Sequence, residues 1–203
     1  MKEKPILFSA KMIRAILRKD KTQTRRVVKN GTEWGAPKDL DDLSGYGLSQ
    51  MRHCCPYGKE GDRLWVRETF GLIDLDVGYA FSSGPLPKSK DGVEPIYRAT
   101  ISDFEESLNP KFWPSIHMPR WASRIDLKLD NIRVEKLQNI TEKDAIAEGC
   151  KPYEVCGNLI TARETFMELW ESINGHTFPW DSNPWVWVVE FEKVTNQQNL
   201  KAA

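Results

Sequence analysis

The sequence predicts an α+β protein built on a small, curved or closed β-sheet with peripheral helices. Residues 161–174 combine a capping box with apolar side chains at helical spacing, which predicts the clearest helix of the chain. Residues 185–192 alternate well enough for a barrel strand, with Trp185, Trp187, Val189 and Phe191 on one face. Strands and helices are interleaved, but their connections are hairpin-like or irregular and lack repeated βαβ crossovers. These features favour a barrel-like sheet over a doubly wound fold.

Local signals place the other elements. Ser9 is the expected N-cap of an amphipathic helix over about residues 10–19. Thr141 is expected to cap a short helix that runs to Glu148 and stops at Gly149. Further strands are expected at residues 4–9, 22–28, 63–70, 95–100, 121–125 and 132–137. Alternation along the second of these strands would place Thr22, Thr24 and Arg26 on one face and Gln23 and Arg25 on the other.

Length and local composition predict one domain. A chain of 203 residues can bury a substantial core, and it fits one domain with insertions better than two domains. Residues 30–62 are rich in Gly, Asp, Pro and Ser and show no sustained period, and residues 71–94 are also loop-like. We therefore expect both segments to be long loops.

Charge and hydropathy exclude several classes of protein. Basic and acidic residues number 29 each, so no overall charge favours bulk polyanion binding. The chain contains no uninterrupted apolar run of about 18 residues, the length that spans a membrane. The apolar stretch near Met1 is too short for a signal peptide, so we expect a cytoplasmic protein.

The four cysteines do not form a zinc-ribbon pattern, because Cys54 and Cys55 are adjacent. His53 beside them could support a metal ion, but adjacent side chains rarely converge on one tetrahedral site. Reduced and partly buried thiols are the preferred interpretation in a chain without an export signal. We expect no metal site and no cofactor.

The first 30 residues carry a local excess of positive charge. They hold ten Lys or Arg side chains, against only Glu3 and Asp20. Within this cluster, residues 21–26 place an amine, two hydroxyls and two guanidinium groups at a helix-to-strand turn, where they could bind a phosphate or the edge of a base. Lys21 could also act as a base on Thr24 if burial removed its proton. Composition alone favours a plainer alternative, a solvated basic surface.

Four segments, taken in order, resemble the ASCH family of PUA-like β-barrels. They are residues 21–26 after the first helix, the Gly-Asp strand turn at 59–66, the strand-then-helix segment at 137–149 and the closing strand at 188–191. The resemblance implies a PUA-like small β-barrel. It also implies a single domain, 1–203, with insertions at about 30–58 and 71–118.

A closer likeness is to phage and prophage ASCH proteins of about this size. The similar stretches are residues 55–58, 65–68, 114–124 and 183–188. Such proteins are commonly named only by their domain, or loosely as morphogenetic proteins. The likeness therefore indicates ancestry more than activity.

One small bacterial ASCH branch is known as an amidohydrolase of N4-acetylcytidine that uses a lysine, a threonine and a glutamate. The resemblance carries these roles to Lys21, Thr24 and Glu148. Lys21 would activate Thr24 for attack on the amide carbonyl, and Glu148 would move the proton to the leaving amine. The chain departs from that branch at Lys19, which replaces a glycine where the helix end favours a positive φ. It also departs at Asp20, a carboxylate that would favour the charged form of Lys21.

A second group of candidates lies in the segment 111–124. His117, Arg120, Trp121 and Arg124 could stack on an unpaired base and hydrogen-bond to it, or His117 could be the acid or base of a ribonuclease-like site. A structural role for these side chains is the alternative. The full set of expected substrate- or RNA-binding residues is Thr22, Arg25, Arg26, Arg67, His117, Arg120, Trp121 and Arg124.

Three functions remain open from the sequence. The first is deacylation of a modified nucleoside such as N4-acetylcytidine. The second is binding of single-stranded RNA, with or without cleavage, and the third is a non-catalytic interaction or assembly role in a phage. The expected partners are a modified nucleoside or single-stranded RNA, and no membrane.

Overall fold

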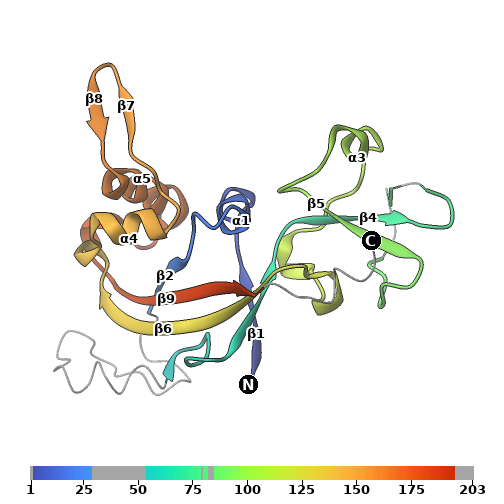
Figure 1. The fold of residues 1–203 in the computed structure, drawn as a ribbon, viewed down its shortest axis with the longest axis horizontal. Coiled ribbons are helices and arrows are strands. Elements are labelled where there is room, and N and C mark those ends of the chain that lie inside the picture. The colour runs from blue at the N-terminus through green and yellow to red at the C-terminus, as the bar shows by residue number, and fades with distance from the viewer. Residues whose placement is uncertain (1, 29–53, 79, 82–84, 195–203) are drawn as a thin grey trace.

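The computed structural model describes residues 2–28, 54–78, 80–81 and 85–194, and these residues confirm the α+β class. Its centre is a five-stranded sheet in the order β1 (Glu3–Leu7), β3 (Arg63–Arg67), β6 (Asp126–Lys136), β9 (Trp185–Val194) and β2 (Gln23–Val27). Strands β1 and β3 are parallel, and the other neighbours are antiparallel. The long pair β6–β9 forms the curved base of the molecule (Figure 1).

Hydrogen bonding leaves the sheet open between its edge strands β1 and β2, so no closed barrel is found in the part of the chain that the structure describes. The two edges nevertheless approach each other. The guanidinium of Arg26 on β2 donates to the carbonyl of Leu7 on β1 at 2.5 Å and lies over the ring of Phe8. A side chain therefore joins the two edges where a barrel would have a strand ladder.

Three of the helices lie close to β2, and their caps follow the sequence signals. The Ser9 hydroxyl accepts from the backbone of Met12 and begins α1 (Ala10–Leu17), as expected. Capping boxes at Thr141 and Thr161 begin α4 (Glu142–Ala147) and α5 (Ala162–Asn174), again as expected. Figure 1 shows α4 and α5 on one side of the molecule and α1 near its middle.

Strand β9 lies between β6 and β2 in the sheet, and it is buried on both faces because each face packs into a different hydrophobic core. Trp187, Val189 and Phe191 pack into a core with β1, β3 and α1, which confirms the face expected for them. Val186 and Val188 are equally buried on the opposite face, where α5 covers them. The alternation of apolar and polar residues is therefore incomplete, as is usual for a central strand.

A second lobe contains the hairpin β4 (Phe70–Asp74) and β5 (Val93–Tyr97) and the short helix α3 (Asp103–Ser107). It has a small core of its own, in which Phe70 stacks on Trp113 at a ring distance of 5.8 Å. Figure 1 shows this lobe on the far side of the molecule from α4 and α5. The expectation of a loop from residue 71 to 94 is therefore wrong at both ends of that range.

Two other expectations need correction. Residues 121–125 do not form a strand, because Arg120–Ala122 form a 3₁₀ turn after Pro119 and β6 begins only at Asp126. A projecting hairpin, β7 (Tyr153–Val155) and β8 (Asn158–Ile160), was not anticipated; its strands are short and mostly exposed, so they carry little pattern. The loop expected at 30–62 and the insertion expected at about 30–58 fall mainly on residues 29–53, which lie outside the described residues.

No helix in the described part of the chain is long and apolar enough to cross a membrane.

Candidate functional site

The turn between α1 and β2 brings Lys21 against the end of α4. Lys19 adopts a φ of 65°, so the positive φ expected at this helix end is confirmed. Lys21 then forms an isolated antiparallel bridge with Glu148, and the next amide, that of Thr22, donates to the carbonyl of Ala147 at 2.8 Å. Backbone hydrogen bonds therefore hold two of the three expected catalytic residues side by side.

The side chains of Lys21 and Glu148 form a buried ion pair. The amine of Lys21 lies 2.7 Å from Oε2 of Glu148 and 2.8 Å from the backbone carbonyl of the same residue. The side chain of Lys21 has 0% of its surface exposed and that of Glu148 has 3%. Burial lowers the pKa of Lys21, and the charge of Glu148 opposes that shift only in part.

Glu148 is shared with a second cation, Arg25. Its Oε1 lies 3.2 Å from the guanidinium of Arg25, which also contacts Glu135 at 2.5 Å and Asp144 at 3.4 Å. Arg25 is fully buried, so these carboxylates balance a charge that would otherwise be very costly to remove from water. In this arrangement Arg25 has no exposed surface for a phosphate of RNA.

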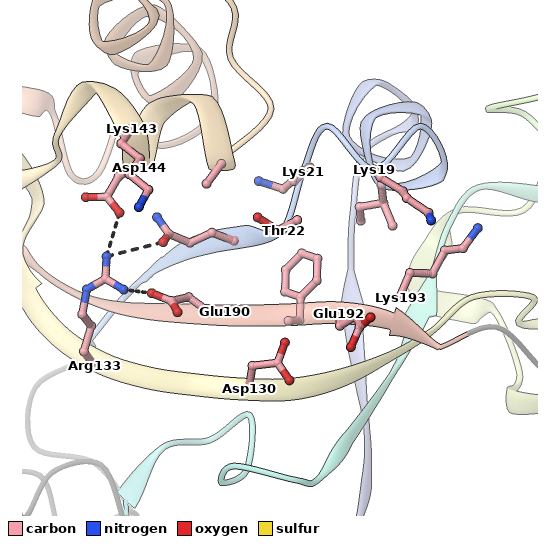
Figure 2. Close-up of a pocket in the computed structure, with 14 residues that line it drawn as sticks. Lys19, Lys21, Thr22, Asp130, Arg133, Lys143, Asp144, Glu190, Glu192 and Lys193 are labelled. Atoms are coloured by element: carbon pink, nitrogen blue, oxygen red, sulfur yellow. Dashed lines mark hydrogen bonds and ion pairs between the residues drawn. The ribbon is translucent and has the colours of Figure 1, made fainter.

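Arg133 extends the charged network to the surface (Figure 2). It donates to Glu135 at 3.2 Å, to Asp144 at 2.9 Å and to Glu190. Burial opposes the ionisation of Asp144, but hydrogen bonds from Thr141 and the charges of Arg25 and Arg133 together hold its pKa below the ordinary value.

Beside this network lies the β-cleft, a hollow of about 770 Å³ between the end of α1, the start of β2, α4 and the strands β6 and β9. Its charged lining is mixed, with Lys19, Lys21, Arg133, Lys143 and Lys193 facing Asp130, Asp144, Glu190 and Glu192. Such a balance offers no strong attraction to a polyphosphate, whereas a neutral polar ligand could be hydrogen-bonded from several sides.

Two further hollows lie on the α1 and α5 side of β2. Thr24 lines one of them, and Glu148 lines both. The inner cavity is a space of about 230 Å³ lined by Thr24, Glu148 and side chains of α1, β2 and α5. The helix groove, of about 610 Å³, lies between α1, α5 and β7. Both share Met12, Glu148 and Leu169 in their walls, whereas Lys21 lines only the β-cleft.

The three expected catalytic residues are thus adjacent but not equivalent. Lys21 and Glu148 are in direct contact, and both are buried, as is Thr24. Thr24 lies on the α1 side of its strand, because it pairs in register with Val189 of that core. Within the described residues, its hydroxyl makes no hydrogen bond with Lys21 or Glu148.

The neighbours of Lys21 on β2 have different surroundings. Thr22 is exposed and lines the β-cleft, and Arg26 is packed against Phe8 at the sheet edge. The expectation that Asp20 acts on Lys21 is wrong, because the carboxylate of Asp20 turns outward. It binds Arg18 at 2.9 Å and Lys151 at 3.0 Å.

The second group of expected binding residues belongs to the other lobe and its junction with the sheet. Arg124 forms a bidentate pair with Glu68, and its guanidinium lies 3.8 Å from the centre of the Tyr97 ring. Arg120 contacts Glu3 and Asp126, Arg67 donates to the carbonyl of Met118, and Trp121 packs partly into the lobe. His117 is exposed. None of these residues lines the β-cleft, the helix groove or the inner cavity.

The charged partners of the site have only weak signals in the sequence. Arg133 and Glu135 lie on the same face of β6, two residues apart, and Asp144 also belongs to the capping box of α4. Polar residues inside an otherwise apolar strand indicate a buried network of ion pairs only when the neighbouring strands are known. Gln23, whose amide lies within hydrogen-bonding range of Arg25 and Asp144, is the other residue of this kind.

All four cysteines are free thiols, with Cys55 and Cys150 buried. Among the described residues, no group of three or more His, Cys, Asp or Glu side chains could hold a metal ion, and His53 lies outside them. No protein-family model, curated protein or solved structure matches the chain.

Proposed function

We propose that the protein recognises an N-acylated nucleoside and hydrolyses its amide through Lys21, Thr24 and Glu148. The observation that carries the proposal is the buried contact of 2.7 Å between the amine of Lys21 and Glu148, at the meeting point of three hollows. A strongly perturbed, buried amine in contact with a carboxylate is typical of sites that transfer protons. We also propose that the fold is related to the PUA-like β-barrels.

The reaction would proceed in two steps. The hydroxyl of Thr24 attacks the amide carbonyl, its proton passes to Lys21 in the neutral form, and an ester to Thr24 forms as the C–N bond breaks. Glu148 carries the proton from Lys21 to the departing amine of the nucleoside. Water then hydrolyses the ester, which releases a carboxylic acid and restores Thr24.

Burial supports the role of Lys21, because it lowers the pKa of the amine and so increases its neutral fraction. The activity should therefore rise with pH through this lowered pKa. Thr24 and Lys21 do not touch in this structure, so the reaction requires the amine to leave Glu148 when substrate is bound. This movement would have to come from the side-chain torsions of Lys21, since its backbone is fixed by the bridge to Glu148.

Release of cytidine from N4-acetylcytidine, followed by liquid chromatography, tests the proposal. Thr24→Val keeps the shape of the side chain and should abolish the release, as should Lys21→Met. Thr177→Val is the matched control, because Thr177 is exposed and lines none of the three hollows. Equal release by wild-type protein and Thr24→Val would refute the mechanism, and no release by folded wild-type protein would refute the activity.

Single-stranded RNA is the second candidate ligand, and one surface favours it. Helix α1 has no acidic residue, and its Lys11, together with Arg18 and Lys151, gives the helix groove a basic wall. Binding through this wall should weaken steeply with salt. Fluorescence anisotropy with a labelled oligonucleotide measures how affinity depends on salt concentration. This dependence should be weaker for the double variant Lys11→Gln, Lys151→Gln and unchanged for Lys90→Gln, which alters a lysine of the other lobe.

A further inference from the structure

The inner cavity combines two kinds of wall. Thr24 and Glu148 supply a hydroxyl and a carboxylate, and Arg25 and Arg26 also line this side, whereas α5 supplies the apolar side chains of Phe166, Leu169 and Trp170. The aromatic rings are well fixed, because Phe166 packs on Trp170 at a ring distance of 6.2 Å and the indole of Trp170 donates to a backbone carbonyl at 2.8 Å. The proposed nucleophile therefore faces a rigid, largely apolar chamber.

The volume of this chamber exceeds that of an acetyl group. At about 30 Å³ for each water-sized group, a cavity of about 230 Å³ has room for several such groups. An acetyl group places a single methyl beyond its carbonyl carbon. Most of the apolar wall would then make no contact with the substrate, and its burial energy would contribute nothing to recognition.

The helix groove, which adjoins this chamber, has the opposite character. Tyr153, Thr165 and Ser172 line it with hydroxyl groups, and Glu168 accepts from the phenol of Tyr153 at 3.3 Å. Glu148 and Leu169 belong to the walls of both hollows. A ligand that spans the boundary would place a polar part in the groove and an apolar part in the cavity, with Thr24 and Glu148 near the junction.

We propose that the inner cavity is an acyl-chain pocket, so that the substrate is a nucleoside acylated with a chain of roughly four or five carbons, with the nucleoside in the helix groove. This inference rests on the proposed function for the reaction at Thr24, and it adds the substrate class. The chemistry is the same amide hydrolysis, with butyric or pentanoic acid as the acid released. Each methylene that enters the pocket should raise affinity about fourfold, and two should raise it about 15-fold.

Binding and turnover are measured separately with N4-acetylcytidine and N4-butyrylcytidine, by calorimetry on the Thr24→Val protein and by chromatography on the wild type. The expected result is a preference of about 15-fold for the butyryl compound in both. Equal affinities, or tighter binding of the acetyl compound, would overturn the pocket whether or not hydrolysis occurs. A butyryl preference in binding without any turnover would support the pocket and refute the hydrolysis. If neither compound binds, both proposals fail.

Leu169 offers a direct test of the location, because it is half-buried on α5 and lines the cavity and the groove. Leu169→Trp should fill the pocket and abolish the preference for the longer chain, and Leu169→Ala should extend it to hexanoyl. Met167→Ala is the matched control on the same helix, since Met167 packs on the α5 core and lines none of the three hollows. The same chain-length profile in the Leu169 variants and in wild type would place the acyl group elsewhere and overturn the inference.

Discussion

The amine of Lys21 and the carboxylate of Glu148 join two segments that lie 127 residues apart in the sequence. The pair closes the space between β2 and the end of α4, and neither group reaches bulk water. Arg25 binds the second oxygen of the same carboxylate. Glu148 is thus shared by two buried cations, and this sharing determines what each substitution will do.

Removal of Glu148 should destabilise the fold more than removal of Lys21. Glu148→Leu leaves Lys21 and Arg25 buried with one fewer carboxylate and should cost about 3–5 kcal/mol. Lys21→Met leaves Glu148 paired with Arg25 and should cost less, about 1–3 kcal/mol. Urea unfolding followed by circular dichroism gives both values, and Glu148→Gln reports the loss of charge with the shape retained. A larger loss for Lys21→Met would contradict this account of the network.

Lys19→Gly should stabilise the protein. Lys19 has a φ of 65°, where a side chain other than glycine is strained, and glycine relieves about 0.5–1 kcal/mol of that strain. Arg18→Gly is the matched control at the preceding position, where φ is −80° and glycine should destabilise by a similar amount. Thermal unfolding should therefore shift in opposite directions for the two variants, and a shift in the same direction would show that the turn is not under strain.

Asp144 should contribute to stability in a pH-dependent way. Its folded pKa lies below the ordinary value of 3.8, so its contribution is fully present above about pH 4 and is lost as the pH falls through the folded pKa. The free-energy difference between wild type and Asp144→Asn should therefore be largest near neutral pH and shrink in acid. Glu154→Gln, on the exposed strand β7, is the control for the removal of a surface carboxylate. A constant difference for Asp144→Asn from pH 7 to pH 3 would argue against the ion pairs with Arg25 and Arg133.

The parts of the fold that could be predicted are those governed by local chemistry. Ser9, Thr141 and Thr161 begin their helices as expected, because a capping hydroxyl acts within three residues of its own position. The contact of Lys21 with Glu148 was expected from a family resemblance and not from any local pattern. It depends on a bridge between distant segments, which no local signal specifies.

The charged surroundings of the site could not be predicted in the same way. Arg25 looked like a free cation in a basic segment, but three carboxylates from β6 and the α4 region surround it in the fold. Asp20 illustrates the converse, because adjacency to Lys21 in sequence did not become contact in space. Side chains of consecutive residues diverge at a tight turn, so charge partners there are decided by tertiary packing.

The rates at which the cysteines react with a disulfide reagent test whether the structure opens near Cys150. Burial raises the pKa of Cys150 to about 11, although the charge of Lys21 opposes the shift, so only about one thiol in a thousand is ionised at pH 8. Cys156, exposed at the tip of the β7–β8 hairpin, should react with a disulfide reagent much faster. Cys156→Ser should remove the fast phase when Cys54, which is only half-buried, is also changed to serine. The rate at Cys150 should then rise about tenfold for each unit by which the pH increases, up to about pH 11. Because Cys150 also lines the helix groove, a nucleoside bound there should slow its labelling further. Fast labelling of Cys150 in this double variant would mean that the wall formed by Lys21 and Glu148 opens readily in solution.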